Sequence, residues 1–183
     1  RDRFWNYTTS YSYSPRPDLL DTYAFEEEPV DYRISTYFKD NMLGTGPVKR
    51  FIKLLDKYQF NEELQYARPA NVIDGTNLIR LPEMHYILAE SLLDSSPSTA
   101  TAYFNAVLNS RGLTSLSNRN TPLTLTLERI TNERYKEFIG EGQTFFNMKR
   151  LNLPIMNTDN VVVPASNQVY VWPIPLDEKE FNY

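Results

Sequence analysis

Three glutamates spaced four residues apart are the feature of this sequence most suited to chemistry. Glu133, Glu137 and Glu141 stand at positions i, i+4 and i+8, so one helix would present all three carboxylates on the same face. Two carboxyl groups that flank a cleft form the acid/base pair of a glycosidase. Because like charges four residues apart repel one another, we favour the alternative of a structural ion-pair network. Its basic members would come from Arg80, Arg111, Lys149 and Arg150, with Arg134 displaced to one side.

Aromatic residues crowd the start of the chain and admit two interpretations. Exposed Trp and Tyr rings next to amide or carboxylate groups can stack on sugar rings and bind their hydroxyls. The same aromatic side chains can instead pack a loop layer over the helices. As ligand-contacting candidates the sequence offers Trp5, Tyr7, Tyr11 and Tyr13, with Asn6 and Asp18 as hydroxyl partners.

The composition of the chain excludes several kinds of site. The 183 residues contain no cysteine and one histidine, which removes disulfides, thiol nucleophiles and Cys/His zinc sites. His85 lies on the flank of an apolar helix face, where we expect a partly buried hydrogen-bonding side chain rather than a base. A net charge of −4 with scattered basic residues argues against a nucleic-acid partner. We therefore expect no catalytic residue, no metal site and no cofactor.

The apolar periodicity predicts a mainly α protein. Helices are expected from Pro82 to Leu92 and from Ser96–Pro97 to Gly112, joined as a tetratricopeptide-like hairpin. One long C-terminal helix is expected from Thr124 or Thr126 to Arg150, with its glutamates and Arg134 largely buried against the helix pair at 82–111. Shorter expected pieces are a helix at 51–58, extended segments around the Asp-Gly turn of 72–79, and strands at 161–163 and 169–172.

The expected organisation has two parts. Residues 1–47 form an irregular, aromatic-rich segment with short strands, packed on the core, and residues 48–183 form the helical region. At this length and an apolar content of 41%, one folded unit is expected, and we interpret it as cut from a longer chain.

Several short motifs occur in a specific order along the chain. The ordered set resembles the C-terminal signature of the SusD/RagB-like outer-membrane nutrient-binding lipoproteins. Thr144 and Asn147 depart from that signature, which usually has Arg and Asp there. The matching elements are Asp31-Tyr32-Arg33, Arg80-Leu81-Pro82-Glu83 leading to Ala89-Glu90-Ser91, Leu108-Asn109-Ser110-Arg111, Ile130-Thr131-Asn132-Glu133-Arg134, Glu137-Phe138-Ile139-Gly140-Glu141-Gly142, and Pro173-Ile174-Pro175.

The resemblance implies a function as well as a fold. It implies a lipid-anchored protein on the surface of the outer membrane that binds glycans or other nutrients without catalysis. Its partner would be a SusC-like TonB-dependent transporter, and the lipid-bearing cysteine would lie outside this chain. The alternatives are a helical-repeat scaffold for protein–protein interaction and a carbohydrate-active hydrolase. The resemblance gives a structural role to Arg80, Glu83, Arg111, Glu133, Arg134, Glu137, Glu141, Gly142 and Pro175.

Overall fold

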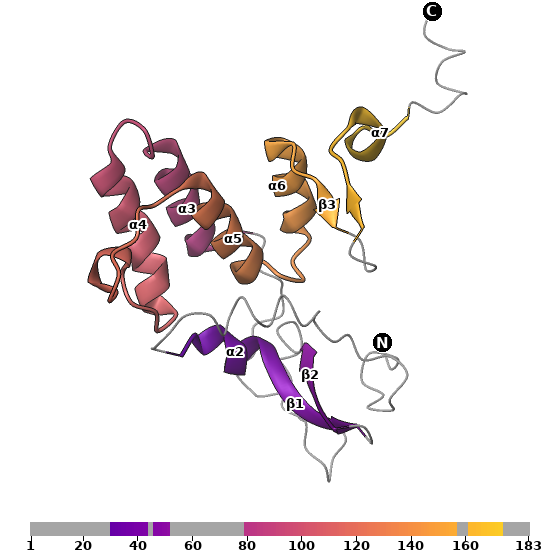
Figure 1. The fold of residues 1–183 in the computed structure, drawn as a ribbon, viewed down its shortest axis with the longest axis horizontal. Helices are drawn as coiled ribbons and strands as arrows, with labels where there is room; N and C mark the ends of the chain where they lie inside the picture. Colours follow the sequence, from indigo (N-terminus) through magenta and orange to yellow (C-terminus); the bar gives the residue numbers. More distant parts are fainter. Residues whose placement is uncertain (1–29, 44–45, 52–78, 157–160, 174–183) are drawn as a thin grey trace, which may run out of the picture. The chain divides into compact units, whose positions relative to one another are not determined.

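The protein is mainly α-helical, as the sequence predicts (Figure 1). The structure, a computed structural model, describes residues 30–43, 46–51, 79–156 and 161–173. The described elements are α2 (Tyr32–Tyr37), β1 (Phe38–Leu43), β2 (Gly46–Phe51), α3 (Leu81–Ser91), α4 (Pro97–Ser110), a 3-10 turn (Leu116–Asn118), α5 (Leu127–Glu137), α6 (Gln143–Leu151), β3 (Ile155–Met156), β4 (Val162–Val163) and α7 (Asn167–Tyr170).

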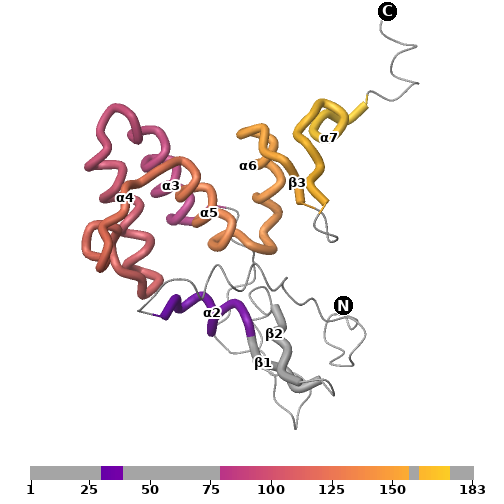
Figure 2. Tube along the Cα trace, in the orientation of Figure 1, coloured from indigo at the N-terminus to yellow at the C-terminus, as the bar shows by residue number. Residues whose placement is uncertain are grey.

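The predicted helical hairpin is present as α3 and α4, which pack side by side (Figure 2). Each helix has a proline in its first turn, where the missing N–H costs no helical hydrogen bond. Helix α4 ends at Ser110 with Arg111 as its C-cap, and Gly112 follows at the expected position with a φ of 81°, the left-handed conformation that glycine adopts without strain. The amide of Gly112 donates to Asn109 O and that of Leu113 to Leu108 O, which satisfies two of the last carbonyls of α4.

The prediction of one long C-terminal helix is wrong. Helix α5 ends at Glu137 and α6 begins at Gln143. Between them Gly140 has a φ of 75° and Gly142 a φ of 77°, conformations that a right-handed helix does not contain. The chain also divides here into two compact units, residues 1–140 and 141–183.

Shorter expectations have mixed outcomes. The strand at 161–163 is present as β4, which pairs antiparallel with β3. The prediction of a strand at 169–172 is wrong, because Asn167–Tyr170 forms the short helix α7. Phe51 was expected to begin a helix, but it is the last residue of β2. Residues 52–58 and 72–78 of the other expected segments lie outside the described residues, as does most of the segment 1–47.

The described residues of the first unit form two apolar clusters of very different size. The larger one joins α3, α4 and α5 around the rings of Tyr86, Phe104 and Phe138. The centroid of the Tyr86 ring lies 6.0 Å from that of Phe104 and 6.1 Å from that of Phe138. The smaller one consists of Tyr37 and Phe38 with the partly buried Ile34 and Ile139. The hairpin β1–β2 follows this small cluster directly, with Phe38 opposite Phe51 and Leu43 opposite Gly46.

The second unit contains α6, the pair β3–β4 and α7. Tyr170 is its buried aromatic residue, packed against the ring of Phe145 at a centroid distance of 5.6 Å. The hydroxyl of Tyr170 donates a hydrogen bond to the carbonyl of Leu153, just after α6 ends at an αL residue, Asn152. Tyr170 therefore connects α7 to the segment that comes after α6.

Candidate functional site

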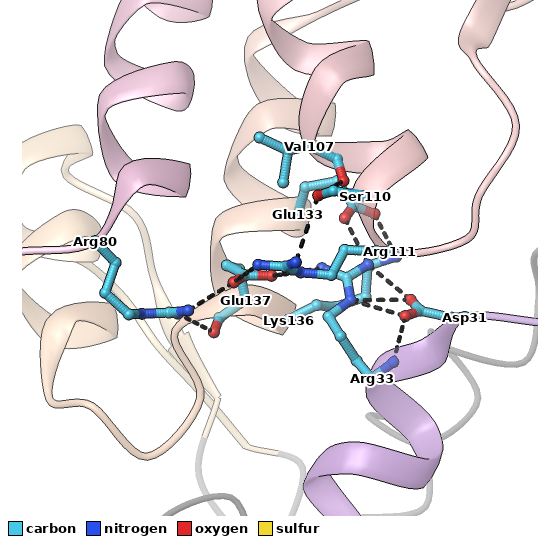
Figure 3. A network of polar contacts seen from close by, with 9 residues as sticks. All are labelled: Asp31, Arg33, Arg80, Val107, Ser110, Arg111, Glu133, Lys136 and Glu137. Carbon is cyan, nitrogen blue, oxygen red and sulfur yellow. Dashed lines mark hydrogen bonds and ion pairs between the residues drawn. The ribbon is translucent and has the colours of Figure 1, made fainter. Parts of the chain in front are cut away.

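Helix α5 carries two buried carboxylates into a network of charged side chains (Figure 3). Glu133 and Glu137 are one helical turn apart, and their exposed fractions are 5% and 0%. The guanidinium of Arg33 lies between them, with Nη2 2.8 Å from Glu133 Oε2 and Nη1 3.5 Å from Glu137 Oε2. Both carboxylates therefore share one cation, which offsets the repulsion that their spacing creates.

Glu137 is the centre of the network. Arg111 binds it in the bidentate geometry, with Nε 2.9 Å from Oε2 and Nη2 2.7 Å from Oε1. Arg80 donates from Nη1 to Oε1 at 2.8 Å and from Nη2 to the backbone carbonyl of Glu137, also at 2.8 Å. Arg80 thus donates hydrogen bonds to both the carboxylate and the backbone carbonyl of Glu137, the last residue of α5. These are two of the four cations that the sequence offers as partners.

Arg33 and Asp31 are network members that the sequence does not connect to the glutamates. Asp31 caps α2 by accepting from the backbone N–H of Arg33 at 3.0 Å. Its carboxylate also binds the Arg33 guanidinium, with distances of 2.9 Å from Nε to Oδ1 and 2.6 Å from Nη2 to Oδ2. Arg33 and Glu133 are 100 residues apart in sequence, so no local spacing reveals their contact.

Further charges adjoin the network. Lys136 forms an ion pair with Glu133 across one turn of α5, and it is 4% exposed. It was not among the cations expected to face the glutamates. Arg134, one position from Glu133, lies on a different side of α5, where Nη2 is 3.7 Å from Glu83 Oε1. The guanidinium groups of Arg80 and Arg134 both lie over the ring of Phe138, at 4.9 and 5.7 Å from its centroid.

Burial and pairing shift the pKa values of these groups in physically opposed ways. Burial alone would raise the pKa of Glu137, but the hydrogen bonds and charge of Arg111 and the charges of Arg33 and Arg80 hold it below its ordinary value. The hydrogen bonds to Glu137 raise the pKa of Arg111. Burial, followed by the charge of Glu137, raises the pKa of Tyr37 to about 12. Glu137 is thus an anion that its surroundings stabilise.

This geometry suits ion pairing rather than proton transfer. A glycosidase acid needs a carboxyl with a raised pKa next to its substrate. Glu137 has a lowered pKa, is fully buried and is occupied by three guanidinium groups. Glu141 lies beyond the end of α5, in the turn before α6, so the expected row of three carboxylates on one helix face is wrong. The expected partners Lys149 and Arg150 lie on α6, and Arg150 donates to Asn147 Oδ1 at 2.8 Å.

Comparison with known proteins identifies the family. Residues 44–180 match the model of the SusD family, which is well over half of the chain. The chain belongs to the SusD family. Its structure is similar to the crystal structure of a SusD superfamily protein from Bacteroides vulgatus, with a TM-score of 0.59 and 25% sequence identity. The similarity covers 86% of this chain and 35% of that one, so the chain spans about a third of the length of that relative. No curated protein sequence matches the chain.

SusD family members are generally non-catalytic binding proteins and outer-membrane lipoproteins. Glu133, Glu137, Arg80 and Arg111 all lie within the span that the family model matches, whereas Asp31 and Arg33 precede it. The network therefore joins the matched helical region to a segment outside the matched span.

The remaining candidate residues fall into two groups. His85 is partly buried, with Nδ1 3.3 Å from the carbonyl of Tyr103 and its ring edge-on to the Tyr103 ring, in keeping with the expected hydrogen-bonding role. Gly142 lies at the start of α6. The residues outside the described part of the chain are Trp5, Asn6, Tyr7, Tyr11, Tyr13, Asp18 and Pro175.

Metal-binding clusters and membrane spans are both absent from the described part of the chain. Among residues 30–43, 46–51, 79–156 and 161–173, no group of three or more His, Cys, Asp or Glu side chains could hold a metal ion. Within the same ranges, no helix is long and apolar enough to cross a membrane.

Proposed function

We propose that this chain is part of a non-catalytic protein of the outer-membrane surface that binds glycans or other nutrients. In this proposal the bound nutrient passes to a SusC-like TonB-dependent transporter, and a lipid anchor holds the protein at the membrane. The observation that carries the proposal is the match of residues 44–180 to the SusD family. The structural similarity to a SusD superfamily protein supports it independently of the motif order in the sequence.

The charge network supports a binding protein over a hydrolase. Glu133 and Glu137 are the two carboxylates best placed by spacing for acid/base work, and both are paired with arginine or lysine side chains. The lowered pKa of Glu137 keeps that carboxyl ionised at neutral pH, so it has no proton to give. In this proposal the helices α3–α5 act as a scaffold, and recognition falls on loops, which can vary without disturbing the packing.

For the ligand site we propose the aromatic start of the chain. Trp5 and Tyr7 are the first candidates, followed by Tyr11 and Tyr13, because their rings can stack on the apolar face of a sugar. Asn6 and Asp18 would bind the sugar hydroxyls. No other stretch of this sequence combines aromatic density with amide and acid neighbours in this way.

Calorimetric titration of the protein with a panel of polysaccharides and oligosaccharides tests the ligand site. We expect Trp5→Ala and Tyr7→Ala each to weaken binding by roughly 0.5–1.5 kcal/mol beyond the area lost. Trp172→Ala is the matched control, because Trp172 is 85% exposed and lies just after the short helix α7. Equal affinity of the Trp5→Ala, Tyr7→Ala and wild-type proteins would move the site away from residues 1–18.

Fractionation of cells that express the protein tests location and partner. We expect the protein in the outer-membrane fraction, accessible to protease added outside the cell, and a TonB-dependent transporter purified together with it from detergent extracts. Recovery from the cytoplasm without a transporter would contradict this part of the proposal and leave the binding of glycans to be judged by titration alone.

A helical-repeat scaffold is the second candidate function. It is favoured by the α3–α4 hairpin and by apolar side chains that α3 leaves partly exposed, Leu81, Met84, Ile87 and Leu88. The titrations distinguish the two candidates. A scaffold would bind no glycan in the panel, and its association with other proteins would be lost in Met84→Asp but kept in Trp5→Ala.

A further inference from the structure

The segment Asp31–Phe38 makes a set of polar contacts with the helices α4 and α5 (Figure 3). Arg33 binds Glu133 and Glu137, and the backbone N–H of Tyr32 donates to the carbonyl of Arg111 at 2.9 Å. Among the described residues, the apolar contacts include the small cluster around Tyr37, in which Ile139 is the member from the chain beyond α5, and the Tyr32 ring beside Gly112.

The helices themselves are held together differently. The cluster that joins α3, α4 and α5 contains eleven buried apolar residues. Burial of apolar area is the dominant favourable term in folding, whereas hydrogen bonds and ion pairs are largely replaced by water when they open. The seam between Asp31–Phe38 and the helices is therefore weaker than the packing within the helices.

Each carboxylate of the network has a cation on its own side of this seam. Within the segment, Asp31 binds Arg33 through Oδ1 and Oδ2. On the helical side, Glu137 keeps Arg80 and Arg111, and Glu133 keeps Lys136, when Arg33 is withdrawn. The large penalty for breaking a buried ion pair arises when one charge is left buried alone. Separation here leaves every carboxylate with a cation and lets water reach both sides.

We propose that Asp31–Phe38 is a latch that opens and closes on the helical layer while α3, α4 and α5 stay folded, and that Arg33 is the residue that holds it closed. Opening breaks the contacts of Arg33 with Glu133 and Glu137 and the hydrogen bond from Tyr32 to Arg111. Because β1 begins at Phe38, the hairpin β1–β2 leaves with the segment. Regions with few buried apolar contacts open locally in this way, below the free energy of global unfolding.

Native-state hydrogen exchange of the 183-residue chain tests the latch. The amide of Tyr32 reports on the seam, and that of Ile130, bonded to Thr126 O inside the apolar cluster, reports on the helices. After correction for intrinsic rates, we expect Tyr32 to exchange at least about tenfold faster than Ile130, the equivalent of about 1.4 kcal/mol. Exchange of Tyr32 should depend little on added denaturant, because local opening exposes little surface. Equal protection and equal denaturant dependence of the two amides would overturn the proposal.

Arg33→Gln tests the role of the guanidinium, with Lys149→Met on α6 as the control cation. We expect Arg33→Gln to speed exchange of Tyr32 by a further factor of about ten, and Lys149→Met to leave it unchanged. Because the open and the unfolded states both lack the Arg33 contacts, exchange of Ile130 can rise by the same factor at most, so Ile130 should stay more protected than Tyr32. Unchanged exchange of Tyr32 in Arg33→Gln would refute the role of Arg33. Failure of α3, α4 and α5 to fold in this variant would refute the latch, and the wild-type comparison provides an independent check.

Discussion

At the scale of single residues, the burial of the Glu137 carboxylate depends on the cations that surround it. An unpaired carboxylate with no exposed surface would cost several kcal/mol in desolvation. Arg80, Arg111 and Arg33 supply three guanidinium groups around it, and Arg111 binds it in a bidentate manner. If the carboxylate were removed, Arg80 and Arg111 would lose this anion, whereas Arg33 would keep Asp31 and Glu133.

Replacement of Glu137 is therefore expected to be costly. We expect Glu137→Ala to lower the free energy of unfolding by about 3–5 kcal/mol, because it leaves the partly buried guanidinium groups of Arg80 and Arg111 without their carboxylate. Urea denaturation followed by circular dichroism measures the change. Glu128→Ala, at an exposed position in the first turn of the same helix, is the control and should change stability by less than about 1 kcal/mol. A similar loss in both variants would refute a special role for Glu137.

The lowered pKa of Glu137 also sets a direction for the dependence of stability on pH. A carboxyl whose pKa is lower in the folded than in the unfolded state contributes stability above its unfolded value, near 4.5. That contribution is lost as the pH falls through the folded value. We expect the difference in unfolding free energy between wild type and Glu137→Gln to be constant from pH 7 to about 5 and to shrink below pH 4.5. A difference that stays constant down to pH 3 would contradict this assignment.

At the scale of elements, the close contact between the end of α4 and the start of α2 is made at a glycine, Gly112. Gly112 has a φ of 81°, and a Cβ at this position would lie 2.7 Å from two ring carbons of Tyr32. Tyr32 also donates its amide to Arg111 O, so the end of α4 and the start of α2 approach each other closely. The backbone conformation thus favours glycine here, and the Tyr32 ring, which is 60% exposed, would have to shift to make room for a Cβ.

Two glycines allow these effects to be separated. Gly142 has a φ of 77° but nothing within 4 Å of its Cβ position, so Gly142→Ala should show the backbone cost alone, roughly 1–2 kcal/mol. We expect Gly112→Ala to cost more than Gly142→Ala in chemical denaturation, because the Tyr32 ring must also move. The excess should fall when Gly112→Ala is combined with Tyr32→Ser. Equal costs for the two single substitutions would mean that the ring moves aside freely.

Local signals in the sequence were sufficient for the helical hairpin but not for the chain beyond it. Pro82, Pro97 and Gly112 mark helix ends through their own backbone restrictions, and the structure confirms the two helices between them. Gly140 and Gly142 carry the same kind of signal, yet the apolar spacing on both sides of them suggested one continuous helix. The segment 169–172 is rich in β-branched and aromatic residues, and its helix α7 depends on packing of Tyr170 that no local pattern encodes.

At the scale of the whole molecule, the charge network combines segments that are remote in sequence. Arg80 and Arg111 could be named in advance, because they flank the predicted hairpin and the glutamates needed cations. Asp31 and Arg33 could not, since their contact with α5 depends on how distant segments come together. The sequence identifies the aromatic residues proposed to contact ligand by their density alone. A ring can stack on a sugar only if the fold leaves it exposed, and a local pattern does not determine that exposure.

The molecule as a whole is expected to bind without turnover. We expect no release of reducing sugar from any polysaccharide that the purified protein binds, because Glu133 and Glu137 are engaged by Arg33, Arg80, Arg111 and Lys136. A reducing-end assay with prolonged incubation measures this. Steady hydrolysis that is abolished in Glu137→Gln and kept in Glu128→Gln would show instead that the carboxylate is catalytic.

The distance in sequence between Arg33 and Glu133 also has a consequence for the order of folding. Closing a loop of this length costs entropy that the local contacts of the α3–α4 hairpin do not require, so the hairpin can form first. We therefore expect the ion pairs of Arg33 to form late, after the folding barrier. In kinetic terms, Arg33 would have a φ-value near zero. Its loss would raise the unfolding rate and leave the folding rate almost unchanged.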